Sequence, residues 1–188
     1  MKESVNYKSI IAVALPVALQ SLIQTSLGVI DQMMVSRLGG TVIAAAGLAT
    51  HPFTILLFLL LGVSGGTGIF VAQYFGNGQY NRISDAVKVS YQYGLLITLP
   101  IMFFAGLAPG FILQFFTNDP EVIAAGTEYL KIISLTFLPL MVILIKSSAL
   151  KACKNVKLPF VAGAVAVIVN TGLNYVFIYG RVPLSAGD

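Results

Sequence analysis

The segment "IAAAGLATHPFTILLFLLLGVSGGTGIFVAQYF", residues 43–75, contains no lysine, arginine, aspartate or glutamate. A membrane-spanning helix needs about 20 mostly apolar residues, because the hydrocarbon core of a bilayer is about 30 Å thick. This segment is longer than that minimum, which fits a tilted helix or a helix with an interfacial turn near His51-Pro52. It therefore predicts a transmembrane helix.

The rest of the chain is similarly apolar. Of its 188 residues, 57% are hydrophobic and only 10% are charged, whereas soluble domains carry about 25% charged residues. A soluble protein this short could not bury so much apolar surface, so lipid must surround much of the chain. The net charge of +4 is spread over the loops between helices, which argues against nucleic acid as a partner.

Four further apolar segments are long enough to cross a membrane, and turn or charge signals such as "GNGQYNRISD" and "TNDPE" separate them. In "TNDPE", Asn118 or Asp119 can cap the next helix and Pro120 suits its first turn. We predict an all-α, polytopic membrane helix bundle of about five transmembrane helices. Their ranges are about 9–36, 43–75, 87–116, 121–148 and 158–179.

Lysine and arginine predict the orientation, since these residues are enriched in cytoplasmic loops. With the N-terminus in the cytoplasm, eight of them lie at cytoplasmic ends and three at the opposite ends. We therefore predict a multi-pass protein of the cell (inner, cytoplasmic) membrane with a cytoplasmic N-terminus. The eight are Lys2, Lys8, Arg82, Lys88, Lys146, Lys151, Lys154 and Lys157, and the three are Arg37, Lys131 and Arg181.

The first predicted helix carries a polar stripe. Gln20, Gln24 and Asp31 fall within about 40° of one another at 100° per residue. A polar stripe on a membrane helix must face protein or water, because lipid offers no hydrogen-bond partners. Asp31 falls in the outer part of the membrane. It is either a solvated interfacial residue or a site that binds and releases a proton or Na⁺.

The fifth predicted helix contains "VNTGLNYV", in which Asn170 and Asn174 share a face four residues apart. Their amides could coordinate a cation or form the interhelical hydrogen bonds that asparagine often makes in membrane bundles. Both readings remain open from the residues alone.

Other residues indicate how the helices pack and bend. Gly62 and Gly66 form a small-xxx-small pair that permits close helix approach. Pro16, Pro100 and Pro139 lie within predicted helices and are hinge candidates. We find no catalytic constellation and no Cys or His cluster for a metal, so we expect neither enzymatic activity nor a cofactor other than a coupling ion.

Four stretches resemble the multidrug and toxic compound extrusion (MATE) family of transporters. Residues 14–53 resemble its first helix, short loop and the start of its second helix, with Pro16, Asp31 and the Ala-rich "AAAGLA" as matching points. The order and spacing of the stretches carry the resemblance. The others are "GVSGGTGIFVAQYFGNGQYNRISDA" (62–86), "NDPEVIAAGTEYLKI" (118–132) and "NTGLNYVFIYG" (170–180).

The resemblance implies two lobes of six helices around a central cleft, a pseudo-symmetric plan found in many transporters. Residues 1–188 would supply about five helices of the N-terminal lobe, and the C-terminal lobe would be missing. The family's coupling role transfers to Asp31, with Asn170 and Asn174 as its polar partners and Gln20 and Gln24 lining the substrate cavity. The family's Asn-xxx-Asp pattern here ends in asparagine at position 174, so one titratable partner is lacking.

The leading functional hypothesis is a cation-coupled (H⁺ or Na⁺) antiporter that exports drugs or other organic, often cationic, compounds. A lipid-linked glycan flippase of the same broad fold is the first alternative. It predicts a more cationic central cavity, whereas the basic residues here lie at helix ends. A non-transporting membrane fragment is the second alternative.

Overall fold

The computed structural model describes residues 40–174 without a gap. It also describes residue 176 and scattered positions of the N-terminal segment. Within these described residues, the backbone forms helices joined by short connections, without strands. The prediction of an all-α bundle is therefore confirmed. Half of the residues of the first predicted span, 9–36, fall outside the described residues. The scattered positions are 11, 14, 15, 17–19, 21–23, 25, 26, 28, 29 and 33.

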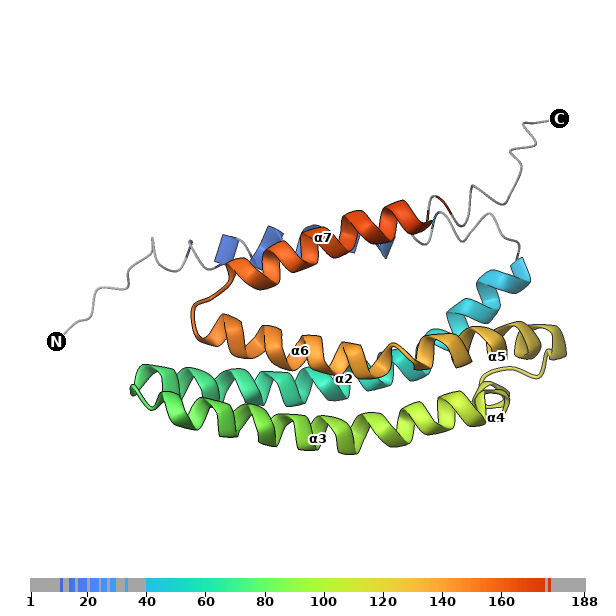
Figure 1. Cartoon of the computed structure of the whole chain (residues 1–188). Helices are drawn as coiled ribbons and strands as arrows, with labels where there is room; N and C mark the ends of the chain where they lie inside the picture. Colours follow the sequence, from blue (N-terminus) through green and yellow to red (C-terminus); the bar gives the residue numbers. More distant parts are fainter. Residues whose placement is uncertain are drawn as a thin grey trace. The chain divides into compact units, whose positions relative to one another are not determined.

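The chain divides into two compact units. Residues Leu38–Cys153 form one, and Met1–Arg37 together with Lys154–Asp188 form the other. The first unit holds α2 to α6, and Figure 1 shows α2, α3 and α6 running side by side within it. The helices are α2 (Gly40–Gly76), α3 (Tyr80–Leu107), α4 (Pro109–Gln114), α5 (Pro120–Ser134), α6 (Phe137–Ala152) and α7 (Lys157–Asn174).

Three of the described helices, α2, α3 and α7, are long and apolar enough to cross a membrane. Helices α5 and α6 pass the same test together, although they are bent by 45° relative to each other. If that bent pair is one span, the described residues contain four. These four occupy the regions of the second to fifth predicted spans.

The third predicted span, 87–116, differs from the structure at both ends. Helix α3 already begins at Tyr80, because the polar sequence before residue 87 continues the helix beyond its apolar part. It ends at Leu107, and Ala108 leaves the helical region with φ −130°. Helical backbone is disfavoured for a residue that precedes a proline, as Ala108 does. Pro109 then starts the separate short helix α4.

The fourth predicted span, 121–148, is broken in the middle. Helix α5 ends at Ser134 and α6 begins at Phe137. Pro139 provides the physical reason, since its ring would clash with the carbonyl four residues earlier, at Leu135, and it offers no N–H to that carbonyl. The break therefore lies just before Pro139, whose role as a hinge stays a prediction.

Pro52 does not break its helix, since α2 continues from Gly40 to Gly76 through this proline. The interfacial turn considered near His51-Pro52 is not formed. The His51 ring stacks on Phe116, with ring centroids 4.9 Å apart and planes inclined by 19°.

Tight packing holds α2 to α6 together around a core of buried aliphatic side chains and Phe137. Small residues mark the closest helix contacts. A Cβ at Gly94 of α3 would lie 2.8 Å from Met141 Sδ of α6, and one at Gly68 of α2 would lie 2.8 Å from Ser148 Oγ. The Ser148 hydroxyl also donates a 2.6 Å hydrogen bond to the Ser64 carbonyl, which fixes α6 against α2.

Candidate functional site

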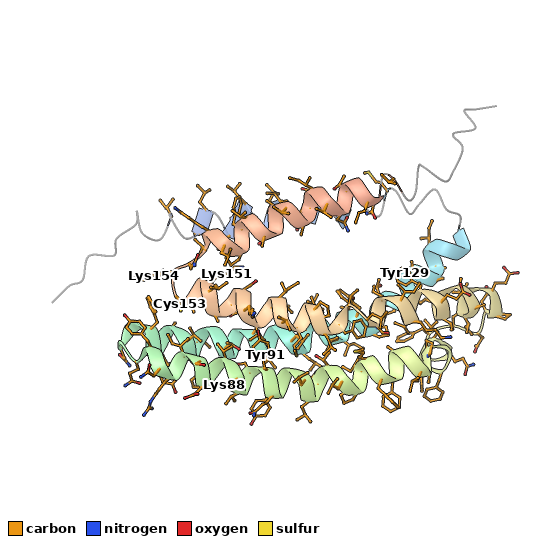
Figure 2. The ribbon with its side chains drawn as sticks, viewed as in Figure 1. Lys88, Tyr91, Tyr129, Lys151, Cys153 and Lys154 are labelled. Atoms are coloured by element: carbon orange, nitrogen blue, oxygen red, sulfur yellow. The ribbon has the colours of Figure 1, made fainter. Side chains whose placement is uncertain are left out.

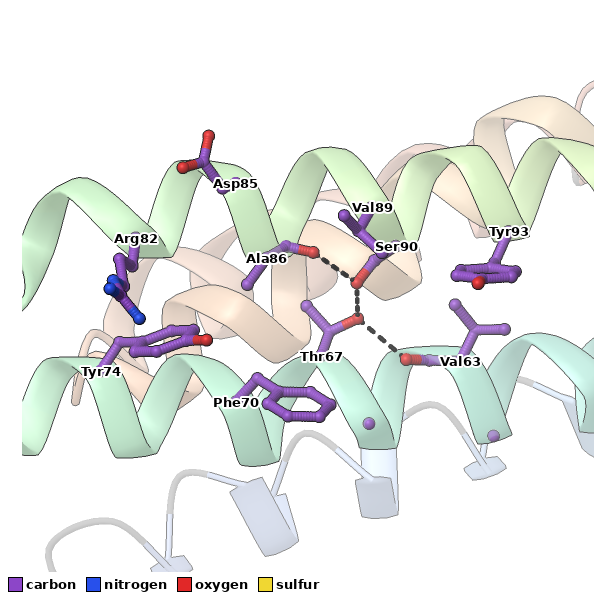
Figure 3. Close-up of a pocket in the computed structure, with 12 residues that line it drawn as sticks. Val63, Thr67, Phe70, Tyr74, Arg82, Asp85, Ala86, Val89, Ser90 and Tyr93 are labelled. Carbon is purple, nitrogen blue, oxygen red and sulfur yellow. Dashed lines mark hydrogen bonds between the residues drawn. The ribbon is translucent and has the colours of Figure 1, made fainter.

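A groove of about 560 Å³ lies between α2 and α3. Figure 3 shows Tyr74 and Arg82 at one end of it and Val63 and Tyr93 at the other. Apolar side chains and glycines dominate its lining, and its charged residues are at the Arg82 end. The lining residues are Gly62, Val63, Gly66, Thr67, Phe70 and Tyr74 of α2, with Arg82, Asp85, Ala86, Val89, Ser90 and Tyr93 of α3.

Two buried hydroxyls join the helices within this groove. Thr67 Oγ1 donates to Ser90 Oγ at 2.7 Å (Figure 3). Each hydroxyl also lies 2.8 Å from a carbonyl of its own helix, Thr67 from Val63 and Ser90 from Ala86. Each hydroxyl therefore has hydrogen-bond partners within the two helices, and the bond between the hydroxyls stabilises the antiparallel contact of α2 and α3.

The charged end of the groove is electropositive. Lys88 and Asp85 form an exposed ion pair with Nζ and Oδ1 3.4 Å apart. Among the described residues, Arg82 has no acidic partner, so its positive charge is not compensated. Arg82 also borders a second hollow of about 360 Å³, formed with Gly78, Gln79, Tyr80 and Asn81.

The turn that carries this second hollow depends on glycine. Gly78 has φ +70°, a left-handed backbone conformation that glycine adopts without strain and that ends α2. Gln79 then precedes α3, and no side chain caps the first N–H groups of that helix. One of these groups, the N–H of Arg82, donates to the Gln79 carbonyl at 3.0 Å, and no side chain accepts from the others.

The predicted amide pair forms within α7. Asn174 donates from Nδ2 to Asn170 Oδ1 at 3.1 Å, so the two amides share one face as the spacing indicates. Asn174 makes a further interaction as well. The pair can present amide oxygens to a cation or hydrogen-bond a carboxylate.

The remaining predicted site residues have different outcomes. Asp31, Gln20, Gln24 and Pro16 lie outside the described residues, so their roles remain predictions. Pro100 is inside α3, which continues through it.

Gly62 and Gly66, predicted to serve helix packing, line the groove. Among the described residues, a Cβ at either position would meet no atom within 4 Å, and their packing role stays a prediction. Close packing within the unit occurs at Gly68, Gly94 and Gly126.

Sequence reasoning missed the groove and its charged end. Arg82 was interpreted only as an orientation signal, and Thr67 and Ser90 were not singled out. Their spacing offered a signal, because two small hydroxyl residues on consecutive apolar helices are candidates for an interhelical hydrogen bond. The sequence alone did not show which turns of α2 and α3 would face each other.

Comparison with protein families matches the chain to the MatE family over residues 16–176. The chain belongs to the MatE family and is a multi-pass membrane protein, which confirms the resemblance. Multidrug resistance protein MdtK of Yersinia enterocolitica is 25% identical over 180 residues, covering 96% of this chain. The protein of the same name from Yersinia pestis is 26% identical over 180 residues. These alignments cover 39% of each relative, so the chain spans about two fifths of their length.

Proposed function

We propose that the chain is the N-terminal part of an efflux antiporter that exports drugs or other organic, often cationic, compounds in exchange for H⁺ or Na⁺. The observation that carries this proposal is the MatE match over residues 16–176. The relatives named multidrug resistance proteins support the substrate class. The function is transport rather than enzymatic catalysis.

Asp31 is the proposed coupling group. A carboxylate in a membrane helix is costly unless protein, water or a cation partners it, and binding of H⁺ or Na⁺ compensates its charge. Asn170 and Asn174 are its proposed partners, because their amides already share one face of α7. Gln20 and Gln24 continue the polar stripe and line the proposed substrate cavity.

Ion binding at Asp31 would drive export by shifting the populations of two helix arrangements. A ligand shifts such an equilibrium only by its difference in affinity for the two states. The bound ion therefore favours the arrangement that binds the organic substrate weakly, and substrate release follows. The ion is needed for coupling and is the only cofactor proposed.

The proposed location is the cytoplasmic membrane, with the N-terminus in the cytoplasm. Within the unit Leu38–Cys153, Lys88 near the start of α3 and Lys151 near the end of α6 lie at one end, and Tyr129 lies at the other (Figure 2). Basic residues gathered at one end support this orientation. A C-terminal lobe is the proposed partner, since the relatives are much longer than this chain.

Dye efflux tests the proposal. The protein, with its C-terminal lobe, would be reconstituted in vesicles carrying either a proton or a sodium gradient, and export of a fluorescent organic cation would be followed. We expect gradient-driven export, and we expect Asp31→Asn to abolish it. Glu128→Gln is the matched control, because Glu128 is an exposed carboxylate on α5, outside the proposed stripe.

Absence of export under both gradients would refute the antiporter function. Unimpaired export by the Asp31→Asn protein would refute the role of this residue while leaving the transporter class intact.

A further inference from the structure

We propose that the groove between α2 and α3 binds one anionic phospholipid, with its phosphate at Arg82 and its acyl chain along the apolar part of the groove. The inference requires only that the chain is inserted in a membrane. It does not depend on the transport activity proposed above.

The apolar part of the groove has the dimensions of one bilayer leaflet. From Arg82 to Tyr93, both of which line it, α3 advances about 16 Å at 1.5 Å per residue. Half of the hydrocarbon core of a bilayer is about 15 Å. Gly62 and Gly66 leave the floor open within the described part of the chain, since a Cβ at either would meet no atom of it within 4 Å. Phe70 and Val89 supply apolar walls.

The charged end of the groove lies at the depth of lipid headgroups. Helix α3 has 28 residues and is about 42 Å long, which exceeds the hydrocarbon thickness of about 30 Å. Its first residues therefore protrude into the interfacial region. Tyr74 and Tyr80, close to Arg82 in the two hollows, are amphipathic side chains that favour this region.

Three features at this end favour a phosphate. The charge of Arg82 has no acidic partner among the described residues, and a guanidinium matches phosphate geometry with two parallel donors. The N-terminus of α3 lacks a side-chain cap and carries the positive end of the helix dipole. The second hollow, of about 360 Å³, provides the space for a headgroup beside both features.

Asp85, the acidic residue that also lines the groove, does not cancel this preference. Its carboxylate is paired with Lys88 at 3.4 Å, and both side chains are 71% exposed. The three side chains therefore sum to one positive charge at the mouth of the groove. This charge is complementary to a singly charged phosphatidylglycerol headgroup.

Tryptophan quenching tests the assignment directly, because the chain contains no tryptophan of its own. Phe70→Trp places a reporter in the groove, and Phe103→Trp places one on α3 outside it. Phe70 and Phe103 are 55% and 59% exposed, so they are matched in exposure. The full chain would be reconstituted in phosphatidylcholine bilayers that contain a small fraction of phosphatidylglycerol with brominated acyl chains.

We expect the brominated lipid to be enriched about fivefold at the Phe70→Trp reporter, the effect of one basic side chain at an anionic lipid, with no enrichment at Phe103→Trp. Adding Arg82→Gln should abolish the excess. Adding Lys151→Gln should preserve it, because Lys151 lies on α6, does not line the groove and leaves the Lys88–Asp85 pair intact.

Other outcomes would overturn the proposal. Equal quenching at both reporters would mean that no site exists. Excess quenching by brominated phosphatidylcholine to the same extent would contradict selection of an anionic headgroup, because phosphatidylcholine carries a phosphate but no net charge. Quenching at Phe103→Trp without any at Phe70→Trp would mean that another part of the protein covers the groove.

Discussion

Overpacking at Gly94 offers a quantitative test of the bundle. A Cβ at this position would lie 2.8 Å from Met141 Sδ, 2.9 Å from Met141 Cγ and 3.1 Å from Ile145 Cδ1. Met141 is 3% exposed and Ile145 is 0% exposed, so neither can move into open space. Extra methyl groups in a well-packed core cost about 1–3 kcal/mol. Gly94→Val should therefore push α3 and α6 apart.

The matched control is Gly65→Val in α2, where a Cβ would meet nothing within 4 Å. Both changes alter intrinsic helix propensity equally, so their difference isolates the packing cost. We expect Gly94→Val to lower the free energy of unfolding by about 1–3 kcal/mol more than Gly65→Val does. Unfolding by sodium dodecyl sulfate in mixed micelles would measure both.

A third variant strengthens this test. Combining Gly94→Val with Met141→Ala should cost less than the sum of the two single changes, because the smaller residue leaves room for valine. If the two glycine variants differ by less than about 0.5 kcal/mol, or if the double variant is additive, the close approach of α3 and α6 is refuted.

Three other predictions concern a cap, a hydrogen bond and a bend. Asp119→Ala should cost about 1 kcal/mol in thermal or denaturant unfolding, because Asp119 Oδ1 accepts from Glu121 N at 2.9 Å; no loss would contradict this cap. A double-mutant cycle of Thr67→Val and Ser90→Ala should give a coupling of about 0.6 kcal/mol, whereas zero coupling would exclude the 2.7 Å bond. Pro139→Ala should reduce the 45° bend between α5 and α6, measured as a distance between spin labels on their exposed faces, and an unchanged distance would assign the bend to another cause.

Local chemistry in the sequence predicted several features of the fold correctly. The uncharged segment 43–75 lies within α2, Gly40–Gly76. The cap at "TNDPE" forms at Asp119, with Pro120 in the first turn and Glu121 after it. These features depend on neighbouring residues alone, which is why composition and spacing were sufficient.

Features that depend on how helices meet were harder to predict. Gly62 and Gly66 have the spacing of a packing pair, yet the close contacts that the described residues make fall at Gly68, Gly94 and Gly126. Which turn of α2 faces α6 is decided by the side chains of α6, such as Ser148 bonded to the Ser64 carbonyl. Hydropathy alone does not contain that information.

Helix breaks were missed for a related reason. No charged residue interrupts the sequence around Leu135 and Thr136, so hydropathy predicted one span where α5 and α6 form a bent pair. Proline was a partial signal, since Pro139 coincides with a break whereas α2 and α3 continue through Pro52 and Pro100. Neighbouring helices can supply hydrogen-bond partners for the backbone carbonyl that a proline leaves unpaired. Only the structure shows which prolines are accommodated within a helix and which lie at a break.

Coupling between ion and substrate at Asp31 is the central claim, and linkage tests it most directly. The dissociation constant of a fluorescent organic cation would be measured on the protein with its C-terminal lobe, across Na⁺ concentration and pH. Because coupling is reciprocal, the coupling ion should weaken substrate binding by about 5- to 150-fold in the unmodified protein. Asp31→Asn should make binding independent of that ion. A substrate affinity that still changes with the ion in the Asp31→Asn protein, or that never changes in the unmodified one, would contradict the account.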